Sequence, residues 1–134
     1  MKQLLLVGFG GMIGSMLRYQ VGMWLSPNSV PFPLGTITVN ILGSLVIGIL
    51  AAYLIKQPMF SLFLITGFCG GFTTFSAFSL ENMKLIQSGQ IWTAALYTLL
   101  SFSIGLISCF GGYYFFLTLA NQETKLTSNT YPEL

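Results

Sequence analysis

The stretch GFCGGFTTFSAFSLEN, residues 67–82, places glycines and hydroxyl side chains inside a segment that is otherwise long and apolar. Gly70-Gly71 and Thr73-Thr74 continue a helix poorly, because glycine is flexible and threonine is branched at Cβ. Within a membrane, backbone that leaves the helix persists only where it is buried in protein or lines a wet cavity. The stretch therefore predicts a membrane helix that is broken near its middle.

The composition of the whole chain is that of a membrane protein. Of its 134 residues, 54% are hydrophobic and only 6% are charged, with a mean hydropathy of +0.78. Soluble domains carry about 25% charged residues. Histidine and aspartate are absent, and the acids are Glu81, Glu123 and Glu133. This shortage of titratable groups argues against an enzyme, and the net charge of +2 argues against a nucleic-acid partner.

Four segments are long and apolar enough to span a membrane, which takes about 20 residues. They cover residues 4–25, 34–55, 59–80 and 91–119, separated by short links with turn-forming or polar residues at 26–33, 56–58 and 81–90. We expect an all-α membrane protein with four transmembrane helices, the third of them broken. A single domain covers residues 1–120, and residues 121–134 form a polar tail that we expect to be disordered.

The basic residues are distributed almost evenly between the two sides of the membrane. Four spans put both termini on one side, together with Lys2, Lys56 and Lys125, whereas the other side has Lys84 and at most Arg18. Lysine and arginine bias sets the orientation of membrane proteins. A weak bias predicts a weakly fixed orientation, so we expect dual topology: the chain inserts both ways and pairs antiparallel in the lipid, as part of an oligomer.

Polar side chains follow one face of the second span and one face of the fourth. Asn40 shares its face with Thr36 and Ser44, and the fourth span begins a similar stripe with Tyr97 and Ser101. An uncharged amide has two N–H donors, which suits a weakly held anion. The alternatives are a hydrogen bond from Asn40 to a neighbouring helix and close packing of small residues along the fourth span.

The third span adds aromatic rings to these polar groups. A broken helix exposes carbonyls that bind cations and N–H groups that favour anions. Phe75 and Phe78 share a face of the second half, among the hydroxyls of Ser76 and Ser79, and Glu81 closes that face. Ring edges carry partial positive charge and can face an anion. Packing against lipid or core is the alternative role of the rings.

Arg18 lies well inside the first span. A charge at the centre of a membrane helix costs about 2.5–3.5 kcal/mol on insertion scales. Two roles are open from the sequence. The side chain either has a structural or interface role, such as extending to the nearby interface where Trp24 ends the span, or it acts directly on an ion.

Three stretches of the chain resemble the signatures of the small fluoride channels, the Fluc (CrcB) family. These stretches are GGMIGSMLRY, GTITVNILGS and GFCGGFTTFSAF, in that order, and the similarity covers roughly residues 3–118. The resemblance implies an antiparallel homodimer with two pores in the bacterial inner (plasma) membrane, crossing it several times. Such a channel passes fluoride passively out of the cytoplasm and relieves fluoride toxicity.

The resemblance also implies roles for particular residues in the ion pathway. Asn40 matches the pore asparagine, Phe75 and Phe78 match the rings whose edges meet the ion, and Tyr97 and Ser101 match a polar track on the fourth span.

Further matches concern a metal ion and the two ends of the pore. Gly70 and Thr73 match the backbone carbonyls that hold a structural sodium ion on the two-fold axis. Arg18 matches a basic residue near the pore entrance, and Glu81 matches an acid near its outer end. Ala77 departs from the family, since many relatives have a hydroxyl there, although Ser76 and Ser79 remain.

Two other functions fit a short, four-span, apolar chain. A dual-topology small multidrug exporter needs a carboxylate embedded in the membrane to couple protons to substrate, and Glu81 near a span end is a poor candidate. A non-conducting subunit of a membrane assembly would explain the glycines, but not a broken span beside a stripe of hydroxyls.

Overall fold

The structure is a computed structural model that describes residues 1–25 and 32–130, with the backbone alone over 123–130. In this part of the chain the elements are α1 (Lys2–Leu25), α2 (Leu34–Tyr53), α3 (Pro58–Ser61), the π-helical η1 (Leu62–Cys69), α4 (Gly70–Phe72), α5 (Phe75–Gln87) and α6 (Ile91–Thr130). Four helical stretches are long and apolar enough to cross a membrane: 2–25, 34–53, 58–87 and 91–122. The four spans expected from the sequence are therefore confirmed. Most of the first expected link, at residues 26–31, lies outside the described residues.

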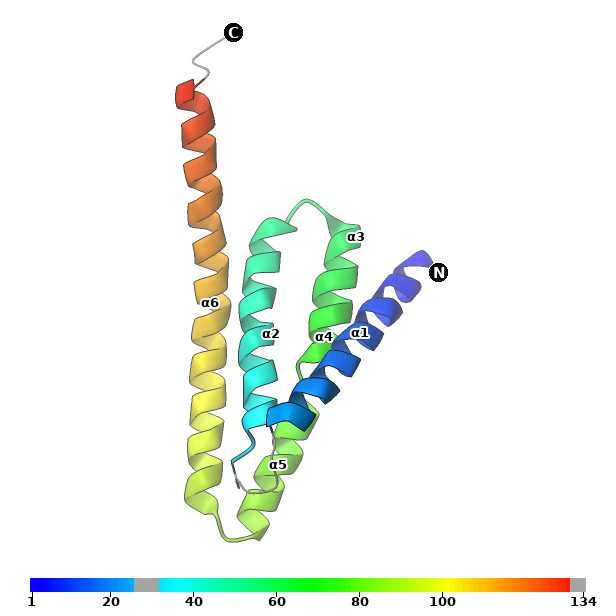
Figure 1. Cartoon of the computed structure of the whole chain (residues 1–134), viewed down its shortest axis with the longest axis vertical. Coiled ribbons are helices and arrows are strands. Elements are labelled where there is room, and N and C mark those ends of the chain that lie inside the picture. Colours follow the sequence, from blue (N-terminus) through cyan, green and yellow to red (C-terminus); the bar gives the residue numbers. More distant parts are fainter. Residues whose placement is uncertain (26–31, 131–134) are drawn as a thin grey trace.

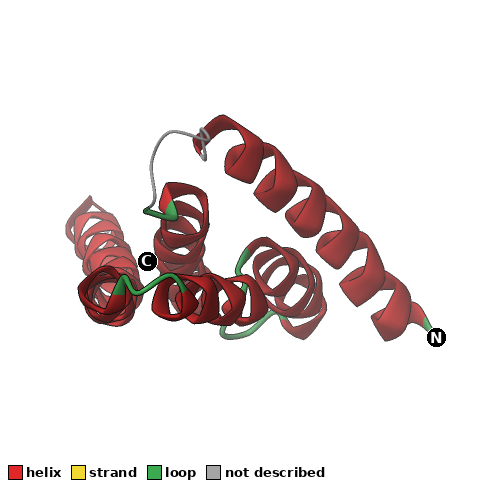
Figure 2. Cartoon of the chain, turned by 90° about the horizontal axis from the view of Figure 1, so that it is seen from below, coloured by secondary structure: helices red, strands yellow, loops and turns green. Residues whose placement is uncertain are grey.

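The helices form a bundle in which α2 packs along α6, while α1 packs against η1 and α4. Figure 1 shows the N-terminus and the C-terminal end of α6 at the same end of the bundle. Seen from below, α1 lies obliquely across the outside of the other helices (Figure 2). This arrangement places the junction of α4 and α5 between α1 and α2.

Glycines bring the helix backbones into direct contact. A Cβ atom added to Gly14 of α1 would collide with the carbonyl oxygen of Phe68 in η1, and one added to Gly48 of α2 would collide with that of Cys109 in α6. Gly10 is in the same position against Phe63. Because lipid supplies no hydrophobic drive between helices, such close van der Waals packing is a main source of their association.

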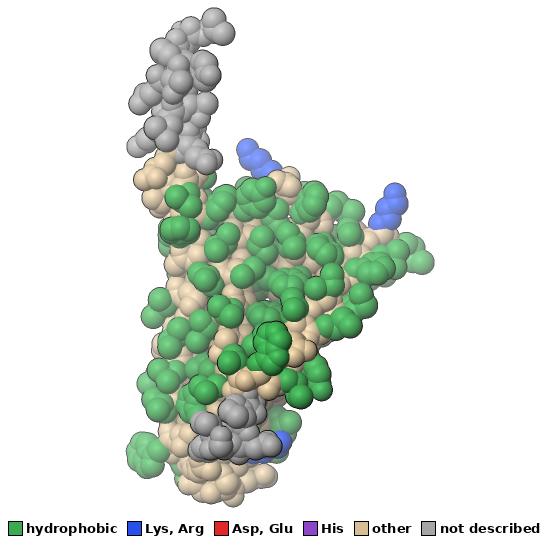
Figure 3. All heavy atoms as spheres, in the orientation of Figure 1, with side chains coloured by type: hydrophobic (Ala, Val, Ile, Leu, Met, Phe, Trp, Pro, Cys, Tyr) green, Lys and Arg blue, Asp and Glu red, His purple; other side chains and the backbone are tan. Residues whose placement is uncertain are grey.

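Few large side chains are fully buried in the single chain. Among the described residues these are Tyr97, Val39 and Cys69, whereas long apolar side chains on α1, α2, α3, α5 and α6 are exposed, including Phe75 with 79% of its surface accessible. Figure 3 shows hydrophobic side chains covering the middle of one face, with basic side chains at its ends. The outer surface is therefore suited to lipid and to contact with a second chain.

The helical conformation stops between α4 and α5, at two threonines. Thr73 has φ −80° and ψ 158°, and Thr74 has φ −152° and ψ 118°, so both are extended. The Thr74 hydroxyl accepts a hydrogen bond of 3.2 Å from the N–H of Ala77 and caps α5, as threonine commonly does at a helix start. Gly70, Gly71 and Phe72 are themselves helical, and the interruption begins at Thr73.

The end of the chain differs from the sequence-based expectation. Helix α6 continues to Thr130, through most of the segment 121–134 that the sequence predicts to be a disordered tail. Once a helix is nucleated and held by packing, each further residue adds a hydrogen bond and its extension is cheap. Residues 131–134 lie outside the described residues.

The contact of α1 with η1 predicts that Gly14 tolerates no side chain. Gly14→Ala should lower the free energy of unfolding in detergent by about 1–3 kcal/mol, because the added methyl overpacks the backbone of η1. Gly8→Ala is the matched control, since nothing lies within 4 Å of a Cβ at Gly8. Thermal unfolding measures both variants, and equal stabilities would contradict the close contact.

Candidate functional site

Asn40 pairs with the extended backbone between α4 and α5. Its Nδ2 donates to the carbonyl oxygen of Thr74 at 3.1 Å, and the N–H of Thr74 donates to Asn40 Oδ1 at 2.8 Å. In a continuous helix this N–H would bond the carbonyl of Gly70, four residues earlier. The side chain of α2 therefore replaces the helical hydrogen bonds that Thr74 lacks.

Arg18 supplies a hydrogen-bond donor to the carboxyl end of α4. Its Nε donates to the carbonyl oxygen of Gly71 at 3.0 Å, an oxygen that the N–H of Phe75 would bond in a continuous helix. A cation is also favourable at the carboxyl end of a helix. Of the two roles open from the sequence, extension to the interface does not describe this contact, because Arg18 turns inward to the helix interruption.

The two carbonyls expected as cation ligands both lose their helical donors. The N–H that would reach Gly70 is taken by Asn40, and the N–H of Ala77, which would reach the carbonyl of Thr73, donates to the Thr74 hydroxyl. The Thr73 hydroxyl donates to Cys69 O at 2.9 Å. Carbonyl oxygens released in this way are hard ligands that suit a cation.

A cavity of about 400 Å³ lies beside the interruption, and we call it the aromatic cavity. Its walls come from α2, α5 and α6: Asn40, Phe75, Phe78, Thr98, Ser101 and Phe102. The rings of Phe75 and Phe78 are 5.6 Å apart between centroids. Ser101 Oγ is buried without a hydrogen-bond partner, and the Asn40 amide uses only one of its two N–H bonds on Thr74. Uncharged donors and aromatic rings therefore meet at one place.

Glu81 joins three helices through two hydroxyls. Thr36 of α2 donates to Glu81 Oε1 at 2.6 Å, and the Tyr97 hydroxyl of α6 donates to Oε2 at 2.7 Å. Such short distances are typical of hydrogen bonds to a carboxylate. Tyr97 is fully buried, and its ring lies 5.0 Å from that of Phe78. Glu81 and Tyr97 therefore form one network immediately next to the aromatic cavity.

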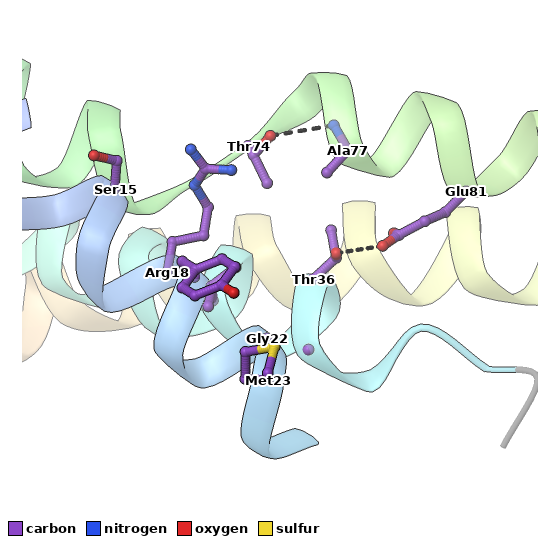
Figure 4. Close-up of a pocket in the computed structure, with 11 residues that line it drawn as sticks. Ser15, Arg18, Gly22, Met23, Thr36, Thr74, Ala77 and Glu81 are labelled. Carbon is purple, nitrogen blue, oxygen red and sulfur yellow. Dashed lines mark hydrogen bonds between the residues drawn. The ribbon is translucent and has the colours of Figure 1, made fainter. Parts of the chain in front are cut away.

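Arg18 and Glu81 line a second cavity of about 370 Å³, which we call the charged cavity. Thr36, Thr74 and Ala77 line the same cavity, and Figure 4 shows Arg18 projecting from α1 toward the chain at Thr74. Ala77, where relatives were expected to carry a hydroxyl, thus faces this cavity with a methyl group.

A third cavity of about 250 Å³, the threonine cavity, lies between the other two. It shares Thr74 with the charged cavity, and Asn40 and Phe75 with the aromatic cavity; its other lining residues are Ser44, Ile47 and Thr73. The three cavities therefore follow one another around the interruption of the helix.

Four of the sequence candidates do not line these cavities: Gly70, Ser76, Ser79 and Tyr97, of which Tyr97 contacts the ring of Phe78. Ser76 and Ser79 are exposed, and neither is among the residues that line the three cavities. Ser76 Oγ is 3.2 Å from Thr74 Oγ1, and the Ser79 hydroxyl donates to the carbonyl of Phe75 at 2.9 Å. In the single chain these two serines therefore make hydrogen-bond contacts within the first turns of α5 and its cap.

Sequence analysis placed Thr36 on the face of Asn40 and Thr74 at the helix break, but it counted neither of them, nor Thr98, among the candidates for the site. Thr36 stands on the same helical face as Asn40, so the spacing could have nominated it as a partner for an acid. Thr74 and Thr98 gave no comparable signal, because their roles depend on contacts with Asn40 and with the aromatic cavity that link separate helices.

The pairing of Asn40 with Thr74 predicts a local loss of protection. Asn40→Leu leaves the N–H and carbonyl of Thr74 without partners, at a cost of about 1–3 kcal/mol. Hydrogen–deuterium exchange should accelerate at the peptide that contains Thr74, and the protein should melt at a lower temperature. Thr38→Val on the same helix is the control. Unchanged exchange in Asn40→Leu would show that another group holds Thr74.

Comparison with known proteins connects this geometry to a family. The CrcB-like protein family (Camphor Resistance, CrcB) matches residues 5–113, which include every candidate residue of the site. Three similar proteins are each named Fluoride-specific ion channel FluC, a name that describes a channel and not an enzyme.

The first of them, from Rhizobium meliloti, is 44% identical over 84% of this chain and 94% of its own length. The protein from Chlorobium chlorochromatii is 43% identical over 81% of this chain and 88% of its own length. The protein from Flavobacterium psychrophilum is 45% identical, with coverages of 84% and 94%. The chain therefore belongs to the CrcB-like protein family.

Proposed function

We propose that this protein is a fluoride-selective passive ion channel, which exports fluoride from the cytoplasm and so relieves its toxicity. Relatives at 43–45% identity carry the name of a fluoride-specific channel, and four helices are able to cross a membrane. The direction of flow follows the fluoride gradient, since the proposed channel couples transport to no other reaction.

The observation that carries the proposal is the aromatic cavity. Fluoride is small and strongly hydrated, so a pathway must replace its water with close donors and still release it. The partnerless hydroxyl of Ser101 and the second N–H of Asn40 are uncharged donors at this cavity, and the edges of Phe75 and Phe78 add partial positive charge. Together they coordinate the ion without the strong hold of a lysine.

The charged cavity is the approach to this pathway. Arg18 attracts anions toward the interruption, while its Nε remains bonded to Gly71. The carboxylate of Glu81 orients the hydroxyls of Thr36 and Tyr97. Ions then pass along the threonine cavity to the rings. In this proposal the helix interruption lines a water-accessible route, which is one of the settings in which non-helical backbone persists at membrane depth.

The carbonyls of Gly70 and Thr73 would hold a structural sodium ion at the dimer interface. The observation that favours this is the diversion of their helical N–H donors to Asn40 and to the Thr74 hydroxyl. Gly70 is also exposed in the single chain, so a second copy can approach it. Bound there, sodium would neutralise converging carbonyl dipoles and fix the two chains together.

The functional unit in this proposal is an antiparallel, dual-topology homodimer in a bacterial inner membrane. Phe75 is 79% exposed in the single chain although it lines the aromatic cavity, and a second chain would cover it and complete the wall. The nearly balanced lysines at the two ends favour insertion in both orientations. The named relatives come from bacteria.

Fluoride transport by the purified protein tests the proposal directly. Liposomes that contain the protein should lose fluoride rapidly when a potassium ionophore balances the charge, and they should retain chloride. An ion-selective electrode follows both ions, and liposomes without protein give the background. Equal loss of fluoride and chloride, or no loss of either, would contradict a fluoride-selective channel.

Replacing either phenylalanine with isoleucine tests the role of the ring edges. Phe75→Ile and Phe78→Ile remain apolar but remove the positive edge, so fluoride efflux should fall about tenfold, which corresponds to about 1.4 kcal/mol. Phe110→Ile on α6 is the control, because Phe110 is 55% exposed and stacks on Tyr114 away from the cavity. Near wild-type efflux from both variants, with the assembly intact by gel filtration, would leave packing as the role of the rings.

A further inference from the structure

Two polar side chains to which the proposed function gives no role join α5 to α6. Asn82 Nδ2 donates to the carbonyl oxygen of Phe78 at 3.1 Å, and the hydroxyl of Thr98 donates to Asn82 Oδ1 at 3.0 Å. One uncharged amide thus links the backbone of an aromatic residue to a hydroxyl on the facing helix.

This link lies between the aromatic cavity and a second, apolar groove. Thr98 lines the aromatic cavity with Phe78 and Ser101. Asn82 and Thr98 also line an apolar groove of about 500 Å³ between α5 and α6. The bond between Asn82 and Thr98 therefore holds a residue that forms part of the wall of the aromatic cavity.

The link is the second of two neighbouring bonds between the same helices. Glu81 bonds Tyr97 at 2.7 Å, and the next residue on each helix makes the bond of Asn82 with Thr98. A single hydrogen bond lets two helices rotate about it, whereas two adjacent bonds fix their rotation and offset. Phe78 also rests on Tyr97, so both bonds lie next to a ring that lines the aromatic cavity together with Ser101.

We propose that Asn82 and Thr98 are positioning residues that set the width of the aromatic cavity, and with it the discrimination between fluoride and chloride. The inference rests on the proposed fluoride channel. Donors around the smaller anion must stand closer together, so a wall that moves outward weakens the coordination of fluoride more than that of chloride. Hydrogen bonds between membrane helices contribute little to stability on average, so the bond can be removed while the fold persists.

The test compares Thr98→Val with Thr98→Ser in liposomes. Valine keeps the shape of the side chain and removes the hydroxyl, whereas serine retains the hydroxyl. Thr98→Val should lower the ratio of fluoride efflux to chloride efflux several-fold, whereas Thr98→Ser should keep the ratio of the wild-type protein. Thr118→Val is the control, since Thr118 on the same helix bonds only the carbonyl of Tyr114 on its own helix.

Asn82→Leu supplies an independent variant, which also serves if Thr98→Val does not give a folded protein. It should lower the flux ratio as Thr98→Val does, and the double variant should be no worse than either single one, because both changes remove the same bond. An unchanged ratio in both single variants, or a loss in Thr98→Ser equal to that in Thr98→Val, would overturn the positioning role. Failure of the wild-type protein to conduct fluoride would instead overturn the proposed function.

Discussion

The arrangement of the site depends on one constraint: a backbone that leaves the helix must find new hydrogen-bond partners. At Thr74 the partner is the amide of Asn40, which bonds both the N–H and the carbonyl, and at Gly71 it is the guanidinium of Arg18. Unsatisfied groups of this kind cost several kcal/mol in a membrane interior. The interruption therefore persists because α1 and α2 each contribute one polar side chain to it.

Glycine contacts bring α1 and α2 close enough for Arg18 and Asn40 to reach the interrupted backbone. Gly14 brings α1 against η1, and Gly43 of α2 faces the methyl group of Thr73, where any side chain would collide. The short reach of an asparagine side chain requires such an approach. Small residues thus act in two ways, because they provide helix association and also place Asn40 within bonding distance of Thr74.

The polar groups of the site divide into committed and available donors. The hydroxyls of Thr36 and Tyr97 are committed to Glu81, and that of Thr98 to Asn82. Ser101 Oγ has no partner, and Asn40 retains one N–H. A transported anion can compete for available donors at low cost, whereas committed donors hold the walls in place. In the proposed channel, this division would give a pathway that is rigid and yet binds weakly, as conduction requires.

The sequence by itself determined the membrane class, the four spans and the family. These follow from composition, from runs of apolar residues and from local stretches such as GFCGGFTTFSAF, all of which act through neighbours along the chain. The sequence also nominated Asn40, Phe75, Phe78 and Ser101, because a helical period already shows which residues share a face of each helix. The structure brings these four residues to one cavity.

Only the tertiary structure decided which partner each polar group takes. Arg18 bonds a carbonyl of the interruption, Ser76 and Ser79 lie outside the three cavities, and Asn82 meets Thr98 on another helix. Helical periodicity predicts the face on which a side chain stands, but it holds no information on the rotation and offset of one helix against the next. Those are set by the close backbone contacts at glycines, and hydrogen bonds between residues 16 to 53 positions apart in the chain depend on them.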